Sequence, residues 1–121
     1  MPPPVAATRW QLSQASANGL FHAHLACTAP PSVGSFQTCT VQLLDADKQP
    51  VTDAQVLIDG GMPAHGHGLP TAPVLKSVDN KGNYQIDGLQ YSMPGAWLLG
   101  FLIKSGQQQD KVLFEFVIGQ M

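Results

Sequence analysis

Histidine and methionine residues gather on glycine- and proline-rich segments of this sequence. One glycine separates His65 from His67, and Met62 lies three residues before His65. A second Met-Pro pair begins at Met93. In an extended segment, side chains two positions apart point to the same side of the chain. Imidazole binds copper, zinc, nickel or iron, and a thioether selects Cu(I), so this pattern predicts a soft-metal site.

The predicted site requires that the two Met-Pro loops lie at the same end of the fold. Its ligands would then be Met62, His65, His67 and Met93, with copper as the metal and Cu(I) preferred. Asp59 precedes the loop and could orient an imidazole through a hydrogen bond, although Asp is equally typical of turns. In the structural alternative, the histidines bond to backbone carbonyls and hold the loop, and the methionines fill the core.

A second His-x-His pair, His22 and His24, lies on the polar phase of a predicted strand. We interpret it as an exposed pair, with a peripheral metal site as the alternative. Enzyme chemistry is poorly supported, because no serine lies in a nucleophile-elbow context and Glu115 is the only glutamate. No phosphate loop or dinucleotide fingerprint occurs. We therefore expect a protein that is not an enzyme.

The composition indicates one all-β domain. Gly and Pro number 12 and 10, and eight short runs of alternating polarity lie between turn signals. These runs predict an immunoglobulin-like antiparallel sandwich of seven to eight strands, at residues 10–14, 20–28, 36–44, 55–58, 74–78, 84–89, 96–104 and 112–118. Residues 1–7 are expected to be a flexible linker before a single domain at 8–121. The net charge of −2 argues against a nucleic-acid partner.

Two cysteines lie on consecutive predicted strands. Cys27 and Cys39 both fall on the apolar phase, on either side of a turn around Val33, so strands that pair about this turn place the two Cβ atoms opposite each other. This arrangement predicts a disulfide, with two buried free thiols as the alternative. The Asn18-Gly19 pair predicts a tight hairpin of type I′ between the first two strands.

A disulfide would suggest an oxidising compartment. No apolar run is long enough to cross a membrane, and no signal peptide is visible. Either the protein is cytosolic, or an export segment has been removed from it. We favour the second interpretation and expect a periplasmic or extracytoplasmic domain, with membrane contact only through a removed N-terminal anchor.

The chain resembles the YtkA-like family of small exported β-sandwich domains, which is related to the FixH-like group. The residues that carry the resemblance are the segment DGGMPAHGHGLPTAP at 59–73, Gly82-Asn83-Tyr84, Gly88-Leu89 and Met93-Pro94-Gly95-Ala96-Trp97. Members of this family look linked to copper handling or cytochrome oxidase assembly, and some carry an auxin-binding label. The resemblance implies an extracytoplasmic role and strengthens the metal hypothesis.

Two main hypotheses follow. In the first, the domain is an extracytoplasmic copper-binding chaperone, buffer or delivery partner, with a periplasmic protein as its partner. In the second, it is an interaction or structural module in which residues 60–73 form a rigid recognition loop held by the histidines. A small-ligand binder with Trp97 and Tyr91 as pocket walls is a remote third hypothesis.

Overall fold

The computed structural model describes residues 8–119, so the linker predicted at residues 1–7 lies outside the described residues. Alternating polarity and frequent turn residues produce a nearly all-β chain. The described part contains a single turn of 3-10 helix, η1 (Pro63–His65), and nine strands: β1 (Trp10–Ala15), β2 (Phe21–Cys27), β3 (Cys39–Asp45), β4 (Gln55–Met62), β5 (His67–Gly68), β6 (Val74–Ser77), β7 (Asn83–Asp87), β8 (Gly95–Ser105) and β9 (Gln108–Ile118).

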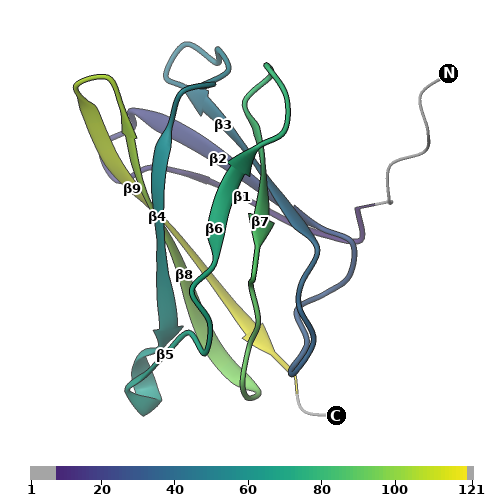
Figure 1. The fold of residues 1–121 in the computed structure, drawn as a ribbon. Helices are drawn as coiled ribbons and strands as arrows, with labels where there is room; N and C mark the ends of the chain where they lie inside the picture. Colours follow the sequence, from purple (N-terminus) through teal and green to yellow (C-terminus); the bar gives the residue numbers. More distant parts are fainter. Residues whose placement is uncertain (1–7, 120–121) are drawn as a thin grey trace, which may run out of the picture.

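The strands form two sheets that face each other, which confirms the predicted sandwich (Figure 1). One sheet has the strand order β1-β2-β3-β7-β6, and the other has the order β5-β4-β8-β9. Neighbouring strands in both sheets run antiparallel. The ninth strand, absent from the prediction, is the two-residue β5. Within residues 8–119 there is no helix long and apolar enough to cross a bilayer.

The core lies between the two sheets and contains the inward-facing residues of each strand. In β8, Trp97, Leu99, Phe101 and Ile103 are buried, as the alternation predicts. Aromatic side chains concentrate at one end, where the ring of Tyr91 lies 5.1 Å from that of Trp97. These residues fix the path of the loop between β7 and β8, because the Trp97 indole Nε1 donates a 2.9 Å hydrogen bond to the Met93 carbonyl.

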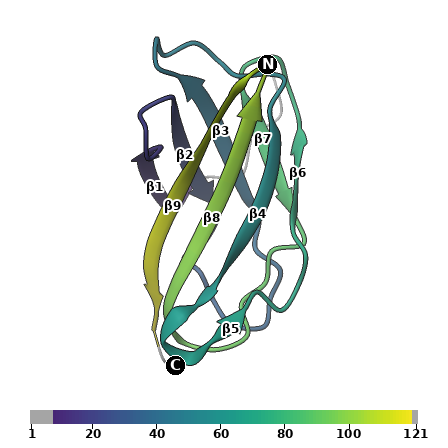
Figure 2. The same ribbon diagram turned by 90° about the vertical axis from the view of Figure 1, so that its left-hand side faces the viewer.

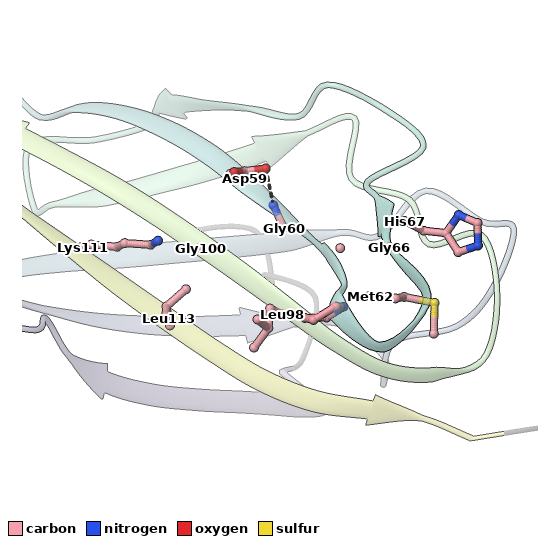
Figure 3. Close-up of a pocket in the computed structure, with 11 residues that line it drawn as sticks. Asp59, Gly60, Met62, Gly66, His67, Leu98, Gly100, Lys111 and Leu113 are labelled. Carbon is pink, nitrogen blue, oxygen red and sulfur yellow. Dashed lines mark hydrogen bonds between the residues drawn. The ribbon is translucent and has the colours of Figure 1, made fainter.

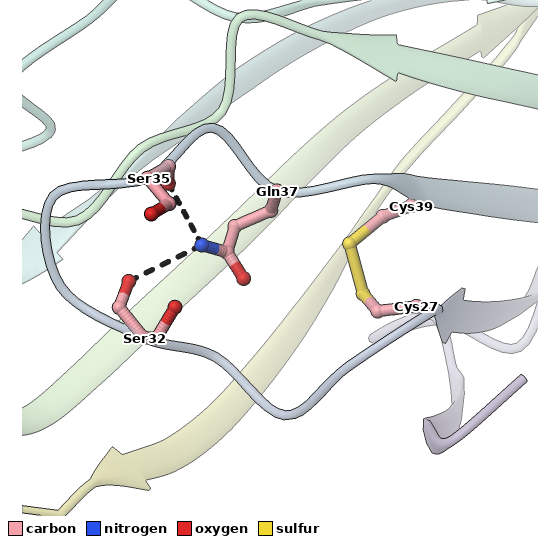
Figure 4. Close-up of a disulfide and its surroundings, with 5 residues drawn as sticks. All are labelled: Cys27, Ser32, Ser35, Gln37 and Cys39. Atoms are coloured by element: carbon pink, nitrogen blue, oxygen red, sulfur yellow. Dashed lines mark hydrogen bonds between the residues drawn. A yellow bond between two sulfur atoms is a disulfide. The ribbon is translucent and has the colours of Figure 1, made fainter.

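The disulfide between Cys27 and Cys39 is present, as predicted (Figure 4). It joins the end of β2 to the start of β3, where the register places the two cysteines directly opposite each other. The strand expected to begin at residue 36 begins instead at Cys39. The reason is that the loop before Thr38 bonds elsewhere: the Gly34 N–H donates to the Tyr91 carbonyl at 3.0 Å, and the Gln37 N–H donates to the Leu89 carbonyl at 2.8 Å.

The hairpin between β1 and β2 is also confirmed, but its turn is not type I′. Gly19 has φ 73°, whereas Asn18 has no positive φ, and the loop spans more than two residues. A buried carboxylate explains the longer loop. Asp110 on β9 accepts hydrogen bonds from the backbone N–H groups of Asn18 and Leu20, at 2.9 and 3.4 Å.

Tyr84 on β7 holds the segment between β3 and β4, which passes from one sheet to the other, through its hydroxyl group. This hydroxyl donates to the Val51 carbonyl at 2.8 Å and accepts from the Ala54 N–H at 3.1 Å. Burial raises the pKa of Tyr84, and the hydrogen bond from Ala54 partly opposes that rise. The sequence left open whether Tyr84 and Tyr91 lie in the core or at its rim, and both are buried.

Candidate metal centre

The His-Gly-His segment is held against the end of β4 by glycines. At Gly61, which has φ 150°, a Cβ would overlap the carbonyl oxygen of His67. Only glycine therefore lets β5 pair with β4 at this distance. Gly66 has φ 65° and closes the η1 turn in the left-handed region. The resulting register places His67 directly opposite Met62.

The two imidazoles form a pair at the surface. The ring centres of His65 and His67 lie 6.2 Å apart, with an angle of 29° between the ring planes. Both residues are exposed, and within residues 8–119 neither imidazole makes a side-chain hydrogen bond. A metal ion bonded to a ring nitrogen lies in the ring plane, about 3 Å from the ring centre, so both rings can hold one ion only when their side chains turn a nitrogen of each toward a common point.

The two thioethers lie deeper than the imidazoles. Met62 is completely buried, and its terminal methyl group packs so closely on Gly95 that a Cβ there would lie 2.6 Å away. Residues directly opposite on paired strands have Cβ atoms about 5 Å apart, so Met62 and His67 are close neighbours. Figure 3 shows their side chains extending toward the same side.

Met93 lies on the second Met-Pro loop, which is at the same end of the sandwich as β5 (Figure 1). The two Met-Pro loops therefore lie at the same end of the fold, as a single site requires. Met93 is partly buried and packs against the core two residues before Gly95, the residue that contacts Met62. Met62 is thus more deeply buried than Met93, and the two imidazoles lie exposed at the same end of the sandwich.

Asp59 lies on the outer face of the sheet that contains β4. Its carboxylate accepts a 2.8 Å hydrogen bond from the N–H of Gly60 (Figure 3). It also lines a hollow of about 260 Å³ together with His67 and Lys111. Lys111 belongs to β9 and was not expected here. Only the register of three adjacent strands brings it to this hollow, so no local pattern in the sequence signals its position.

Alternative donors are sparse. Within the described residues no group of three or more His, Cys, Asp or Glu side chains could hold a metal ion. The second pair, His22 and His24, lies on the outer face of β2, away from the Met-Pro loops. The His24 Nδ1 is 2.6 Å from the Ser13 hydroxyl. Among residues 8–119, methionine sulfur lies beside a histidine pair only at the β4–β5 end, where it could add to the two imidazoles.

Trp97 and Tyr91, the candidate pocket walls of the third hypothesis, are core residues. Both are almost fully buried, and their rings contact each other. Burial raises the pKa of the Tyr91 hydroxyl above its ordinary value. These contacts explain the two side chains as packing residues of the aromatic end of the core.

Comparison with known proteins agrees with the position of the motif. No curated protein and no solved structure matches this chain significantly. The sequence does match the YtkA-like family over residues 17–99, a range that includes both Met-Pro loops and the His-Gly-His segment. Because this match spans well over half of the 121 residues, the chain belongs to the YtkA-like family.

Proposed function

We propose that this YtkA-like domain binds copper, with Cu(I) preferred, at the end of the sandwich formed by the β4–β5 turn and the β7–β8 loop. The ligands are His65, His67, Met62 and Met93. The observation that carries the proposal is the continuity of the donors, because a stacked imidazole pair at the surface leads through the His67–Met62 cross-strand pair to a buried thioether.

The chemistry of the donor set favours Cu(I) over harder metals. Thioethers are soft, neutral ligands that suit Cu(I), whereas imidazole binds several transition metals. The exposed histidines provide the first contact for an incoming ion. Recruitment of Met62 then requires the η1 turn to move outward, since this side chain is now completely buried against Gly95. Two metals should therefore respond differently: Cu(I) uses all four residues, and Zn²⁺ uses only the imidazoles.

The disulfide supports an extracytoplasmic location, because disulfides persist in oxidising compartments and are rare in the cytosol. In such a compartment a domain without catalytic residues serves as a copper chaperone, buffer or delivery partner. Delivery to a periplasmic protein, including one involved in oxidase assembly, is the role that the family suggests. The domain is not an enzyme in this proposal.

An anaerobic Cu(I) titration against a chromogenic chelator tests the proposal. We expect one-to-one binding by the wild type and its loss in the His65→Ala/His67→Ala variant. The His22→Ala/His24→Ala variant is the matched control, since it removes another His-x-His pair from the other sheet and should bind as the wild type does. Failure of the wild type to compete for Cu(I) would overturn the proposal.

The methionines are tested separately. Met62→Leu conserves most of the volume of a buried side chain and removes only the sulfur, so the fold should be retained. We expect this variant and Met93→Leu to bind Cu(I) at least about tenfold more weakly, while Zn²⁺ binding stays unchanged. Equal loss of both metals would instead indicate that the loop had been distorted.

The recognition-loop hypothesis makes a different prediction for the same histidine variant. If the histidines hold the loop, their replacement must lower the melting temperature. The structure gives this version little support, because within residues 8–119 the imidazoles make no side-chain hydrogen bonds, and the β4–β5 ladder and Gly66 hold the turn. A melting temperature unchanged within about 1 °C would exclude it.

A further inference from the structure

The outer face of the β4-β8-β9 sheet is apolar and uncovered. Figure 2 views this face directly, and of the described segments only the turn that carries η1 lies over one end of its three long strands. Four of its side chains are large, hydrophobic and at least one-third exposed: Leu57, Leu102, Leu113 and Val117, at 70, 37, 42 and 73%. A contiguous apolar patch of this kind typically marks an interaction surface.

The strand register orders these side chains into rows across the face. One row contains Leu57, Leu102 and Lys111, and the next contains Asp59, Gly100 and Leu113. A third row contains Gly61, Leu98 and Glu115, and a fourth contains Ala96 and Val117. The hollow of about 260 Å³ described above lies on this face, where Gly61 and Gly100 leave no side chain.

The arrangement of charges on β9 is self-complementary. Lys111 and Glu115 are exposed and lie two residues to either side of Leu113. Consider a two-fold axis that runs parallel to the face and across the strands, through the row of Gly100 and Leu113. This axis places Lys111 of each copy opposite Glu115 of the other, so the dimer contains two such charge pairs.

The same axis fits the apolar residues. It places Leu102 opposite Leu98 of the other copy. It also places the highly exposed Leu57 opposite Gly61, whose outer side is covered by the carbonyl group of His67. We propose that this face, the β4-β8-β9 face, docks against the same face of a second copy to form a two-fold symmetric dimer.

The size of the face indicates how stable this dimer is. The axis brings three of these rows in each copy into contact, and rows spaced about 6.8 Å apart along three strands about 4.8 Å apart cover roughly 300 Å² per copy. The total of about 600 Å² is well below the usual range for stable complexes, so the dimer is weak and depends on concentration. Asp59 of one copy lies opposite Asp59 of the other at the rim of this interface. The repulsion between the two carboxylates weakens the dimer further at low salt.

Sedimentation velocity of the wild type from about 10 μM to 1 mM should show a reversible monomer–dimer equilibrium. Lys111→Glu and Glu115→Lys should each raise the dissociation constant about tenfold, because each variant replaces two attractive contacts with repulsive ones. The double variant Lys111→Glu/Glu115→Lys restores opposite charges and should return to the wild-type value. A mixture of the two single variants should form a heterodimer, since both of its charge contacts are then attractive.

The controls separate this dimer from general stickiness. Val78→Glu removes another exposed hydrophobic side chain that lies off this face, and it should leave the dissociation constant unchanged. Leu113→Glu, at the centre of the face, should abolish the dimer while its circular dichroism spectrum stays that of the wild type. A wild type that is monomeric at 1 mM overturns the proposal. A charge-swapped double variant no tighter than its parents overturns the two-fold arrangement on which it rests.

Discussion

Removal of the Cys27–Cys39 disulfide should destabilise the domain by about 3 kcal/mol. The bond closes a loop with a sequence separation of 12. In the chain-entropy description, a cross-link over a loop of this length removes about 10 cal/mol/K from the unfolded state, which is about 3 kcal/mol at 25 °C. For 121 residues the unfolding entropy is about 0.25 kcal/mol/K, so the melting temperature should fall by about 12 °C.

Urea unfolding followed by the fluorescence of the buried Trp97 measures this loss. The variant is Cys27→Ala/Cys39→Ala, and the matched control is the wild type unfolded with a reductant present. Both should lose about 3 kcal/mol, because both open the loop and only the variant also removes the sulfur atoms. A loss below about 1 kcal/mol in the reduced wild type would refute the reasoning. The expected loss is a large fraction of the 5–15 kcal/mol typical of a domain, so reduction of this bond would leave the fold far less stable.

Three further substitutions test individual contacts. Tyr84→Phe leaves two backbone groups without their partner and should cost about 1–3 kcal/mol in urea unfolding. Gly95→Ala combines a φ of 128° with a contact on Met62, and it should cost about 1–3 kcal/mol, whereas Gly106→Ala, with a positive φ but open space, should cost less. Burial acts to raise the pKa of Asp110, but hydrogen bonds from Ser16 and three backbone N–H groups lower it more. Its carboxylate therefore stabilises the fold above the ordinary pKa of 3.8, and this contribution is lost as the pH falls through the lower folded-state pKa. Asp110→Asn should be less stable than the wild type at pH 7, and this difference should shrink below about pH 4.

The core and the disulfide could be predicted from the sequence because both depend on a period of two along single strands. Cys27 and Cys39 share the apolar phase of neighbouring strands, and the register places them opposite each other. The boundaries of β3 could not be predicted in this way. The backbone N–H groups of Gly34 and Gln37 bond to the carbonyls of Tyr91 and Leu89, which are far away in the sequence.

The sequence contained a local signal that Asp110 makes a buried polar contact. This residue belongs to the inward-facing series of β9 with Val112 and Phe114, so a carboxylate stands in a position that otherwise carries core residues. Such an exception to the alternation predicts a buried polar contact, although it does not identify the partner. The partner is the β1–β2 turn, and only the packing of two sheets brings it near. For the same reason, the exposed β4-β8-β9 face could not be recognised before its three strands were placed side by side.

The disulfide and the candidate copper ligands are connected through the loop that the disulfide closes. The Gly34 N–H bonds to the Tyr91 carbonyl, and the Gln90 side chain donates a 2.7 Å hydrogen bond to the Gly34 carbonyl. These bonds attach the closed loop to the segment that leads to Met93, two residues beyond Tyr91. Because a ligand held in place loses less entropy on binding, an oxidised disulfide favours a preorganised Met93. The disulfide therefore also supports one side of the proposed copper site.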